Sequence, residues 1–264
     1  MKHEILSQIN AECPWRDTLH WYDTIDSTNN QAKALAGAGA PHGTVLIAGH
    51  QTGGRGRLGR SFSSPSGMGV YLSVILRPNC PPDQLMHLTC AAAVAMCNAV
   101  EQAAGFRPGI KWTNDLVYEN KKLGGILTEL SATGNMTDYA IVGIGINCRQ
   151  QVSDFSPELQ SIATSLSMIT GQDTPPWLLA AAMIRALADM DRTLLTGKSD
   201  ILSAYRKDCI TLGREVVLLQ AEQTCSGRAV DLDDDGGLIV CLADGTMRTV
   251  TSGEVSVRGM YGYV

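Results

Sequence analysis

The segment from Gly53 to Arg60 constrains this chain more than any other stretch of its sequence. It reads Gly-Gly-Arg-Gly-Arg-Leu-Gly-Arg, four glycines and three arginines with too little apolar surface to build a core. Such a backbone can approach a ligand closely and line an anion with its N–H groups, while arginine supplies forked donors for phosphate or carboxylate. The Gly-Lys-Ser/Thr ending of a Walker loop is missing. The residues alone leave three interpretations: a ligand-binding loop, a solvated flexible loop, or an arginine-glycine segment that contacts RNA.

The rest of the chain has the composition of an ordinary folded protein. Its 264 residues, 44% of them hydrophobic, suffice for one large domain or for a large and a small one. A formal net charge of −5 argues against a protein that mainly grips nucleic acid backbone. We see no signal peptide and no apolar stretch long enough for a bilayer. The eight scattered cysteines form no C-x-x-C pair, so we expect reduced thiols in a cytoplasmic protein rather than a zinc site.

Local patterns predict a first unit of mixed helices and strands. Ser27-Thr28-Asn29 offers N-cap side chains for a helix through Leu35, stopped by Gly37 and Gly39. Further helices are expected at 83–104, 176–195 and 199–209. Short β-rich runs predict strands at 44–50, 69–76, 116–118, 125–130 and 139–146, with residues 119–122 near the turn of a hairpin.

After Gly213 the pattern changes to short β-type runs. Asp-Gly pairs at 235–236 and 244–245 separate these runs and are typical of tight turns. About fifty residues of this kind predict a small antiparallel barrel. The sequence therefore predicts an α+β domain over residues 1–211 and a small β-domain over residues 212–264.

Three further segments are candidates for chemistry, and each has a structural alternative. Lys111-Trp112-Thr113-Asn114-Asp115 could hold a phosphoanhydride or position Mg²⁺, or it could form an Asx turn. Lys122, just ahead of Gly124-Gly125, could place an ammonium beside a ligand or simply decorate a hairpin turn. Gly143-Ile144-Gly145-Ile146-Asn147 is either part of a binding site or a close-packed strand end.

Taken together and in their order along the chain, these motifs resemble those of one family. The motifs at 27–29, 51–60, 111–115, 122–126 and 143–147 are similar to those of biotin protein ligases, also called biotin–[acetyl-CoA-carboxylase] ligases. The similarity runs from about residue 20 to the end of the chain. It implies a catalytic domain of the biotin/lipoyl ligase type, related to class II aminoacyl-tRNA synthetases, with a mixed β-sheet flanked by helices. Residues 212–264 would form an SH3-like barrel, and the first twenty or so residues an N-terminal extension.

The resemblance also implies a two-step reaction. The carboxylate of biotin attacks the α-phosphate of ATP, with Mg²⁺, to give biotinyl-5′-AMP and pyrophosphate. A lysine of a biotin carboxyl carrier protein or carrier domain then attacks this mixed anhydride. Two anions must meet, so cationic groups have to offset their repulsion.

Carried over position by position, the resemblance assigns roles to individual residues. Lys122 and Arg57 would be catalytic, Lys122 through electrostatic stabilisation. Biotin would be bound by Ser27, Thr28, Asn29, Gln51, Gly54, Arg55, Gly56, Arg57, Lys122 and Gly125. The nucleotide would be bound by Arg57, Arg60, Phe62, Lys111, Asn114, Asp115 and Asn147. Phe62 stands where the family often has a tryptophan that stacks on adenine, and the metal ligands are not identified.

Other classes of function compete with this interpretation. Lipoate–protein ligases share the catalytic fold and the adenylation chemistry. A regulator that senses biotinyl-AMP would need an N-terminal helix-turn-helix domain of about sixty residues, but only about twenty residues precede Trp21. An RNA-associated protein would need a basic patch that the sequence does not show. We therefore expect an enzyme, monomeric or homodimeric, without nucleic-acid or membrane partners.

Overall fold

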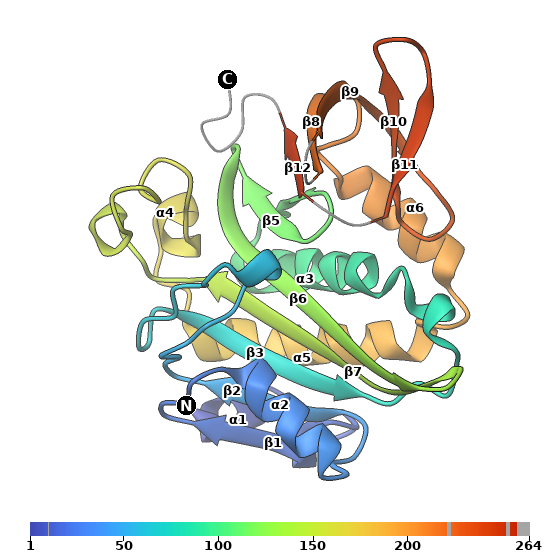
Figure 1. Ribbon diagram of the computed structural model, residues 1–264. Helices are drawn as coiled ribbons and strands as arrows, with labels where there is room; N and C mark the ends of the chain where they lie inside the picture. The colour runs from blue at the N-terminus through green and yellow to red at the C-terminus, as the bar shows by residue number, and fades with distance from the viewer. Residues whose placement is uncertain (10, 221–222, 252–253, 258–264) are drawn as a thin grey trace.

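A mixed sheet forms the centre of the molecule (Figure 1). The computed structural model describes residues 1–9, 11–220, 223–251 and 254–257. Within them, seven strands lie in the order β1-β2-β3-β7-β6-β5-β4. The first pair is parallel and every other pair is antiparallel. The strands are β1 Leu19–Tyr22, β2 Thr44–Ala48, β3 Gly69–Leu76, β4 Gly109–Lys111, β5 Asp115–Tyr118, β6 Lys121–Thr133 and β7 Met136–Asn147.

Helices cover both faces of this sheet (Figure 1). The α-helices are α1 Lys2–Gln8, α2 Thr28–Gly37, α3 Leu88–Ala104, α4 Leu166–Thr170, α5 Pro176–Thr193 and α6 Lys198–Asp208. Short 3-10 turns lie at Arg16–Thr18, Arg57–Gly59, Pro82–Leu85 and Val152–Asp154. Within the described ranges, no helix has the length and apolar character that crossing a membrane requires.

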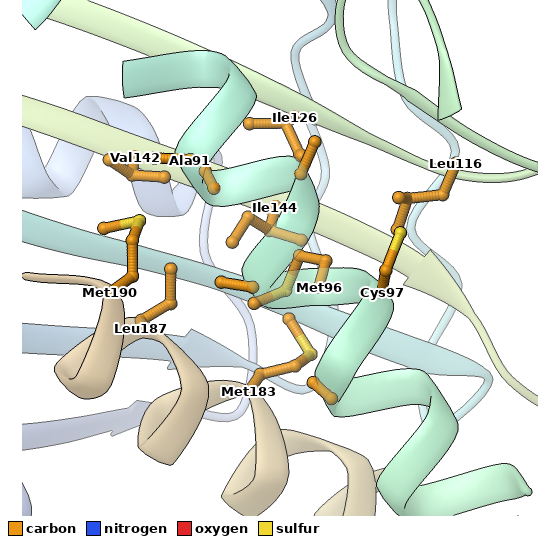
Figure 2. Packing of buried hydrophobic residues seen from close by; sticks show 14 of the residues in the cluster. Ala91, Met96, Cys97, Leu116, Ile126, Val142, Ile144, Met183, Leu187 and Met190 are labelled. Atoms are coloured by element: carbon orange, nitrogen blue, oxygen red, sulfur yellow. The ribbon is translucent and has the colours of Figure 1, made fainter. Parts of the chain in front are cut away.

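The central strands are buried on both sides, so their side chains divide between two apolar layers. On one face, Val142 and Ile144 of β7 meet α3 and α5 through residues such as Met96 and Leu187 (Figure 2). On the other face, Ile141 packs with the alanines of α2. Because both faces are covered, all eight residues of β3 are buried, which explains its nearly continuous apolar sequence.

The C-terminal part folds as a second, antiparallel sheet. Its strands are β8 Glu215–Gln220, β9 Gln223–Leu232, β10 Leu238–Leu242, β11 Met247–Val250 and β12 Glu254–Val257. In the described residues their order is β11-β10-β9-β8-β12, consistent with an SH3-like domain. Gly236 and Gly245 both adopt φ near +85°, which glycine tolerates best. The predicted Asp-Gly turns are thereby confirmed.

Most predicted elements differ by a few residues from their bounds in the structure, and two differ most. The helix expected from Asp83 begins only at Leu88, after a separate 3-10 turn. The backbone leaves helical geometry at His87, whose buried imidazole Nε2 lies 2.8 Å from the Leu194 carbonyl oxygen. The strand expected at 125–130 runs from Lys121 to Thr133, because its polar ends pair with β5 and β7. Backbone pairing, which an apolar pattern does not reveal, fixes the bounds of β6.

The Ser27-Thr28-Asn29 sequence begins α2 as predicted, but not by side-chain capping. Ser27 is the N-cap residue and makes no side-chain cap hydrogen bond, and the helix continues to Gly37. The side chains of Thr28 and Asn29 instead bond to the sheet and to the loop after β2. The prediction of a capping role was therefore wrong, and the Thr28 and Asn29 side chains have other hydrogen-bond partners.

Candidate functional site

A cavity brings the separate sequence motifs together. It lies between the start of α2, the Gly-Arg segment and the strands β5, β6 and β7. Every predicted site residue except Gly54 and Asn147 lines it. Those lining residues are Ser27, Thr28, Asn29, Gln51, Arg55, Gly56, Arg57, Arg60, Phe62, Lys111, Asn114, Asp115, Lys122 and Gly125. Segments separated by up to about a hundred positions in the sequence thus share one site.

One end of the cavity is a network of neutral polar side chains. The Thr28 backbone N–H and hydroxyl both donate to Gln51 Oε1, at 2.8 and 3.1 Å. Gln51 Nε2 in turn donates to Ser64 Oγ at 2.8 Å. Ser73, fully buried on β3, places its hydroxyl 2.8 Å from Thr28 Oγ1 and 2.6 Å from Asn29 Oδ1. These bonds fix each amide and hydroxyl in one orientation, which suits recognition of a neutral polar group.

Asn29 connects this network to a charged cluster at the rim. Its Nδ2 donates to Glu129 Oε2 at 2.9 Å. Glu129 also pairs with Lys33 at 2.5 Å and with Arg55 at 3.2 Å. Burial by itself would raise the pKa of Glu129, but the hydrogen bonds from Lys33 and Asn29 outweigh it and lower that pKa. The positive charge of Arg55 is therefore largely offset at this end.

The opposite end of the cavity carries the lysine singled out by sequence. Lys122 Nζ lies 2.7 Å from Asp115 Oδ1, across the β5–β6 pair. The Lys122 main chain is anchored as well, since its N–H donates to Ile162 O at 2.7 Å and its carbonyl accepts from Thr164 N–H at 2.9 Å. Lys111 and Arg60 line the same end. This concentration of cations suits anionic groups.

The Gly-Arg segment is folded as a small hairpin over the cavity. Gly56 N–H donates to Arg60 O at 2.7 Å, and Phe62 N–H donates to Gly54 O at 2.9 Å. From its tip, Arg57 Nη1 donates to Asn114 Oδ1 at 2.9 Å. Asn114 is itself held by β6, because its Nδ2 donates to Ile126 O at 2.9 Å. Arg57 therefore connects the hairpin to Asn114 and, through Asn114, to β6.

Three predicted glycines are required by close packing. A Cβ at Gly143 would collide with the Asn29 amide, and a Cβ at Gly145 would lie 2.5 Å from Phe62 Cε1. The two glycines of β7 thus leave room for a binding-site amide and an aromatic ring. Gly54 does not line the cavity, and a Cβ there would strike the Phe62 carbonyl. Residues 143–147 therefore form a close-packed strand end, and Gly143, Ile144 and Gly145 of this segment also line the cavity.

Asn147 lies in a second cavity that adjoins the first. The two cavities share six residues, Arg60, Ser61, Phe62, Lys111, Asp115 and Lys122. The second continues along an apolar wall formed by Phe155, Leu159, Ile162 and Ala163. Asn147 Nδ2 donates to Thr164 O at 3.0 Å, and its Oδ1 accepts from Gln150 Nε2 at 3.1 Å. Lys122 therefore lies at the junction of the two cavities. The first has the neutral polar network at its other end, and the second has an apolar wall.

Sequence reasoning missed several residues of this site. Ser73 and Glu129 complete the polar network, and Ile126, Leu127 and Ile144 give the first cavity an apolar middle. For Ser73 a signal existed, since it is the one polar side chain in the apolar run of residues 69–76. The apolar lining gave no signal, because its members look like any other core residues.

The comparisons with known proteins agree with this geometry. The chain matches the Biotin/lipoate A/B protein ligase family over residues 21–147 and the biotin protein ligase C-terminal domain over residues 211–258. It is 35% identical over 240 residues to the bifunctional ligase/repressor BirA of Bacillus subtilis, covering 90% of this chain and 74% of that protein. The chain belongs to the biotin protein ligase family.

Other biotin protein ligases are similar over nearly their whole length. The biotin–[acetyl-CoA-carboxylase] ligase of Mycobacterium tuberculosis is 32% identical, with 94% of this chain and 91% of that one covered. A structure of the biotin protein ligase from Aquifex aeolicus in complex with biotin and ATP superimposes with a TM-score of 0.77 at 31% identity. That match covers 91% of this chain and 98% of the Aquifex chain.

Metal-binding groups are sparse in this biotin protein ligase. Over the part of the chain that the structure describes, no cluster of three or more His, Cys, Asp or Glu side chains could hold an ion. Asp115 is the one carboxylate that lines the first cavity there, beside Lys122. Magnesium is usually bound by one or two carboxylates together with substrate phosphates, so these residues fit an ion that arrives with a nucleotide.

Proposed function

We propose that this chain is an ATP-dependent biotin–protein ligase. It joins the carboxylate of biotin to the α-phosphate of ATP, forming biotinyl-5′-AMP and releasing pyrophosphate. It then transfers the biotinyl group to a lysine of a biotin carboxyl carrier protein or domain. The family, and relatives named for biotin and acetyl-CoA carboxylase, support this assignment.

One observation carries the proposal: the first cavity is neutral at one end and cationic at the other. Biotin has the matching polarity, with a neutral ureido ring, an apolar body and an anionic carboxylate. We assign the ureido ring to the network of Thr28, Gln51 and Asn29, whose amide and hydroxyl groups offer both donors and acceptors. The carboxylate then lies near Lys122, at the junction with the second cavity.

The second cavity is our candidate for the nucleotide. Its shared cations Arg60, Lys111 and Lys122 suit phosphates, and its apolar wall suits a purine base. Phe62 lines both cavities, with its ring edge-to-face with Tyr71 at 6.4 Å between centroids. We propose that Phe62 borders the bound adenylate and that Asn147 lies on the adenosine side.

In the first step, a biotin carboxylate oxygen forms a bond to the α-phosphorus while the bond to the pyrophosphate oxygen breaks. Lys122 reduces the repulsion between the two anions and stabilises the charge that builds on phosphorus. Magnesium would neutralise charge on the phosphate oxygens, with Asp115 as the carboxylate in reach of it. Asp115 also keeps Lys122 directed into the junction through their 2.7 Å contact.

In the second step, the acceptor lysine amine attacks the biotinyl carbonyl carbon. An amide bond forms, the bond to the AMP oxygen breaks, and the amine loses its proton. The reactive anhydride must be shielded from water until the acceptor arrives. We assign that task to the hairpin of residues 53–60, held down by the Arg57–Asn114 hydrogen bond.

Pyrophosphate release with ATP and Mg²⁺ tests this function. The assay is run with biotin and, in parallel, with lipoate, and the product is identified by mass. Biotin-dependent release together with a biotinyl-AMP product is the expected result. Release with lipoate alone would move the chain to the lipoate ligases, and no release with either would refute adenylation.

A further inference from the structure

The segment of residues 111–115 is held in place from outside the central sheet. The Trp112 indole N–H donates to Gly236 O at 2.9 Å, and the Trp112 backbone N–H donates to Thr211 Oγ1 at 2.9 Å. The Tyr205 hydroxyl donates to Thr113 O at 3.0 Å. Trp112, Thr211 and Tyr205 are all buried, so water does not compete for these bonds. Burial also raises the pKa of Tyr205 well above its ordinary value, so its hydroxyl stays a donor.

The Gly236 carbonyl is presented by a tightly built turn between β9 and β10. Asp233 Oδ1 accepts from the backbone N–H groups of Asp235 and Gly237, at 2.9 and 2.7 Å. Asp233 N–H donates to Gly237 O at 2.9 Å, closing the turn. The turn also sits close against α3, because a Cβ at Gly236 would lie 2.8 Å from Cys90 Sγ. The position of the Gly236 oxygen is therefore set by the small sheet and its Asp233 side chain.

The β9–β10 turn therefore holds the segment of residues 111–115, which forms part of the candidate active site. Trp112 and Thr113 immediately precede Asn114, which receives Arg57, and Asp115, which pairs with Lys122. A shift at Trp112 would therefore move Asn114 and Asp115, the partners of Arg57 and Lys122. Thr28, Gln51 and Ser73, at the neutral end of the cavity, belong to other elements and make none of these bonds.

We propose that the C-terminal sheet takes part in adenylation through its β9–β10 turn. Asp233 fixes the Gly236 carbonyl, this carbonyl fixes Trp112, and Trp112 sets the position of Asn114 and Asp115 against Arg57 and Lys122. Trp112 and Asp233 are thus positioning residues for the nucleotide end of the site, and not for the biotin end. This inference rests on the proposed biotin-activating function.

The test compares two Asp-Gly turns of the same sheet. Asp233→Ala removes the side-chain acceptor of the β9–β10 turn, and Asp233→Asn retains an oxygen that can accept the same bonds. Asp244→Ala is the matched control, because Asp244 Oδ1 accepts from Thr246 N–H in the β10–β11 turn, and in the described part of the chain this turn makes no hydrogen bond to residues 111–115. Trp112→Phe removes the indole donor directly and serves as a second variant; because Trp112 also lines the first cavity, it is compared by its kcat/KM for ATP alone.

Biotin-dependent exchange of pyrophosphate into ATP and calorimetric binding of biotin are measured for each full-length variant. Asp233→Ala and Trp112→Phe should lower kcat/KM for ATP about tenfold, the size expected for losing a buried hydrogen bond. In Asp233→Ala, whose side chain does not line the first cavity, the Kd for biotin should stay within about twofold. Asp233→Asn should recover most of the exchange, and Asp244→Ala should match the unaltered protein. Equal loss in the two Asp→Ala variants, or equal loss of biotin affinity, would overturn the proposal.

A measurement independent of activity separates this proposal from the proposed function. The hydrogen-exchange rate of the Trp112 indole N–H, followed by NMR, should rise in Asp233→Ala and stay unchanged in Asp244→Ala. Absence of exchange activity in the unaltered protein would refute biotin activation without touching this result. An unchanged Trp112 rate in Asp233→Ala would overturn the positioning role even if the enzyme is active.

Discussion

Replacing Lys122 with alanine should slow adenylation about 100- to 1000-fold while leaving the fold intact. Its ammonium lies 2.7 Å from Asp115, and the two side chains are 35% and 14% exposed. Because water screens a pair this exposed, losing it costs about 1 kcal/mol of stability or less. For a chain of this size such a loss lowers the unfolding temperature by about 2–4 °C at most.

Replacing Lys122 should affect the rate of the chemical step far more than it affects the stability of the fold. Removing one group directed at developing charge lowers the rate about 100- to 1000-fold. Biotin affinity should change only about fivefold, because a solvent-exposed charge contributes about 1 kcal/mol and the ureido ring binds at the neutral end. Lys122 therefore acts mainly on the transition state, and its loss should appear in the rate rather than in binding.

Pyrophosphate exchange into ATP measures the rate, and calorimetry without nucleotide measures biotin binding. Lys121→Ala is the matched control, since Lys121 is the neighbouring lysine of β6 and lines neither cavity. Equal losses of exchange and biotin affinity would refute the electrostatic role. A Lys121→Ala variant as slow as Lys122→Ala would also refute it, because the loss of any nearby positive charge would then explain the slower exchange.

Three further variants test other parts of the site. Arg57→Gly removes the bond to Asn114 and should release biotinyl-AMP early, so biotinylation of lysines on an added bystander protein should rise; no rise would contradict the shielding role. Ser73→Ala leaves two buried oxygens without their hydroxyl partner and should weaken biotin binding about tenfold in calorimetry, with the KM for ATP as the control that stays constant. Glu129 has a lowered pKa when folded, so its charge stabilises the protein above about pH 4.3, and this stability is lost as the pH falls through the folded value. Glu129→Gln should therefore unfold at a lower temperature than the unaltered protein at pH 7, with a deficit that shrinks as the pH falls below about 4.3, and a deficit that stays constant on acidification would exclude the linkage.

Much of the fold was predictable because local sequence patterns favour the same helices and strands that the tertiary structure contains. The bounds of β3 were predicted as observed, since an eight-residue β-rich run between Gly and Pro has few other interpretations. The bounds of β6 were not, because its ends are polar and are held by backbone pairing with β5 and β7. Capping by Ser27, Thr28 and Asn29 was predicted wrongly, because Ser27 makes no side-chain cap hydrogen bond and the Thr28 and Asn29 side chains bond to the distant Gln51 and Glu129.

The sequence by itself determined the alternation of elements, the Asp-Gly turns and the chemical character of the site. Residue types that are rare in a core, such as the arginines and glycines of 53–60, indicate a loop rather than a packed element, and their N–H and guanidinium groups suit an anion. Only the tertiary structure decided which groups face each other. Ser73 meets Thr28, Lys122 stands at the junction of two cavities, and Trp112 bonds to Gly236, 124 positions away. Such contacts depend on how the sheets and helices pack, and short-range propensities carry no information about partners so distant in sequence.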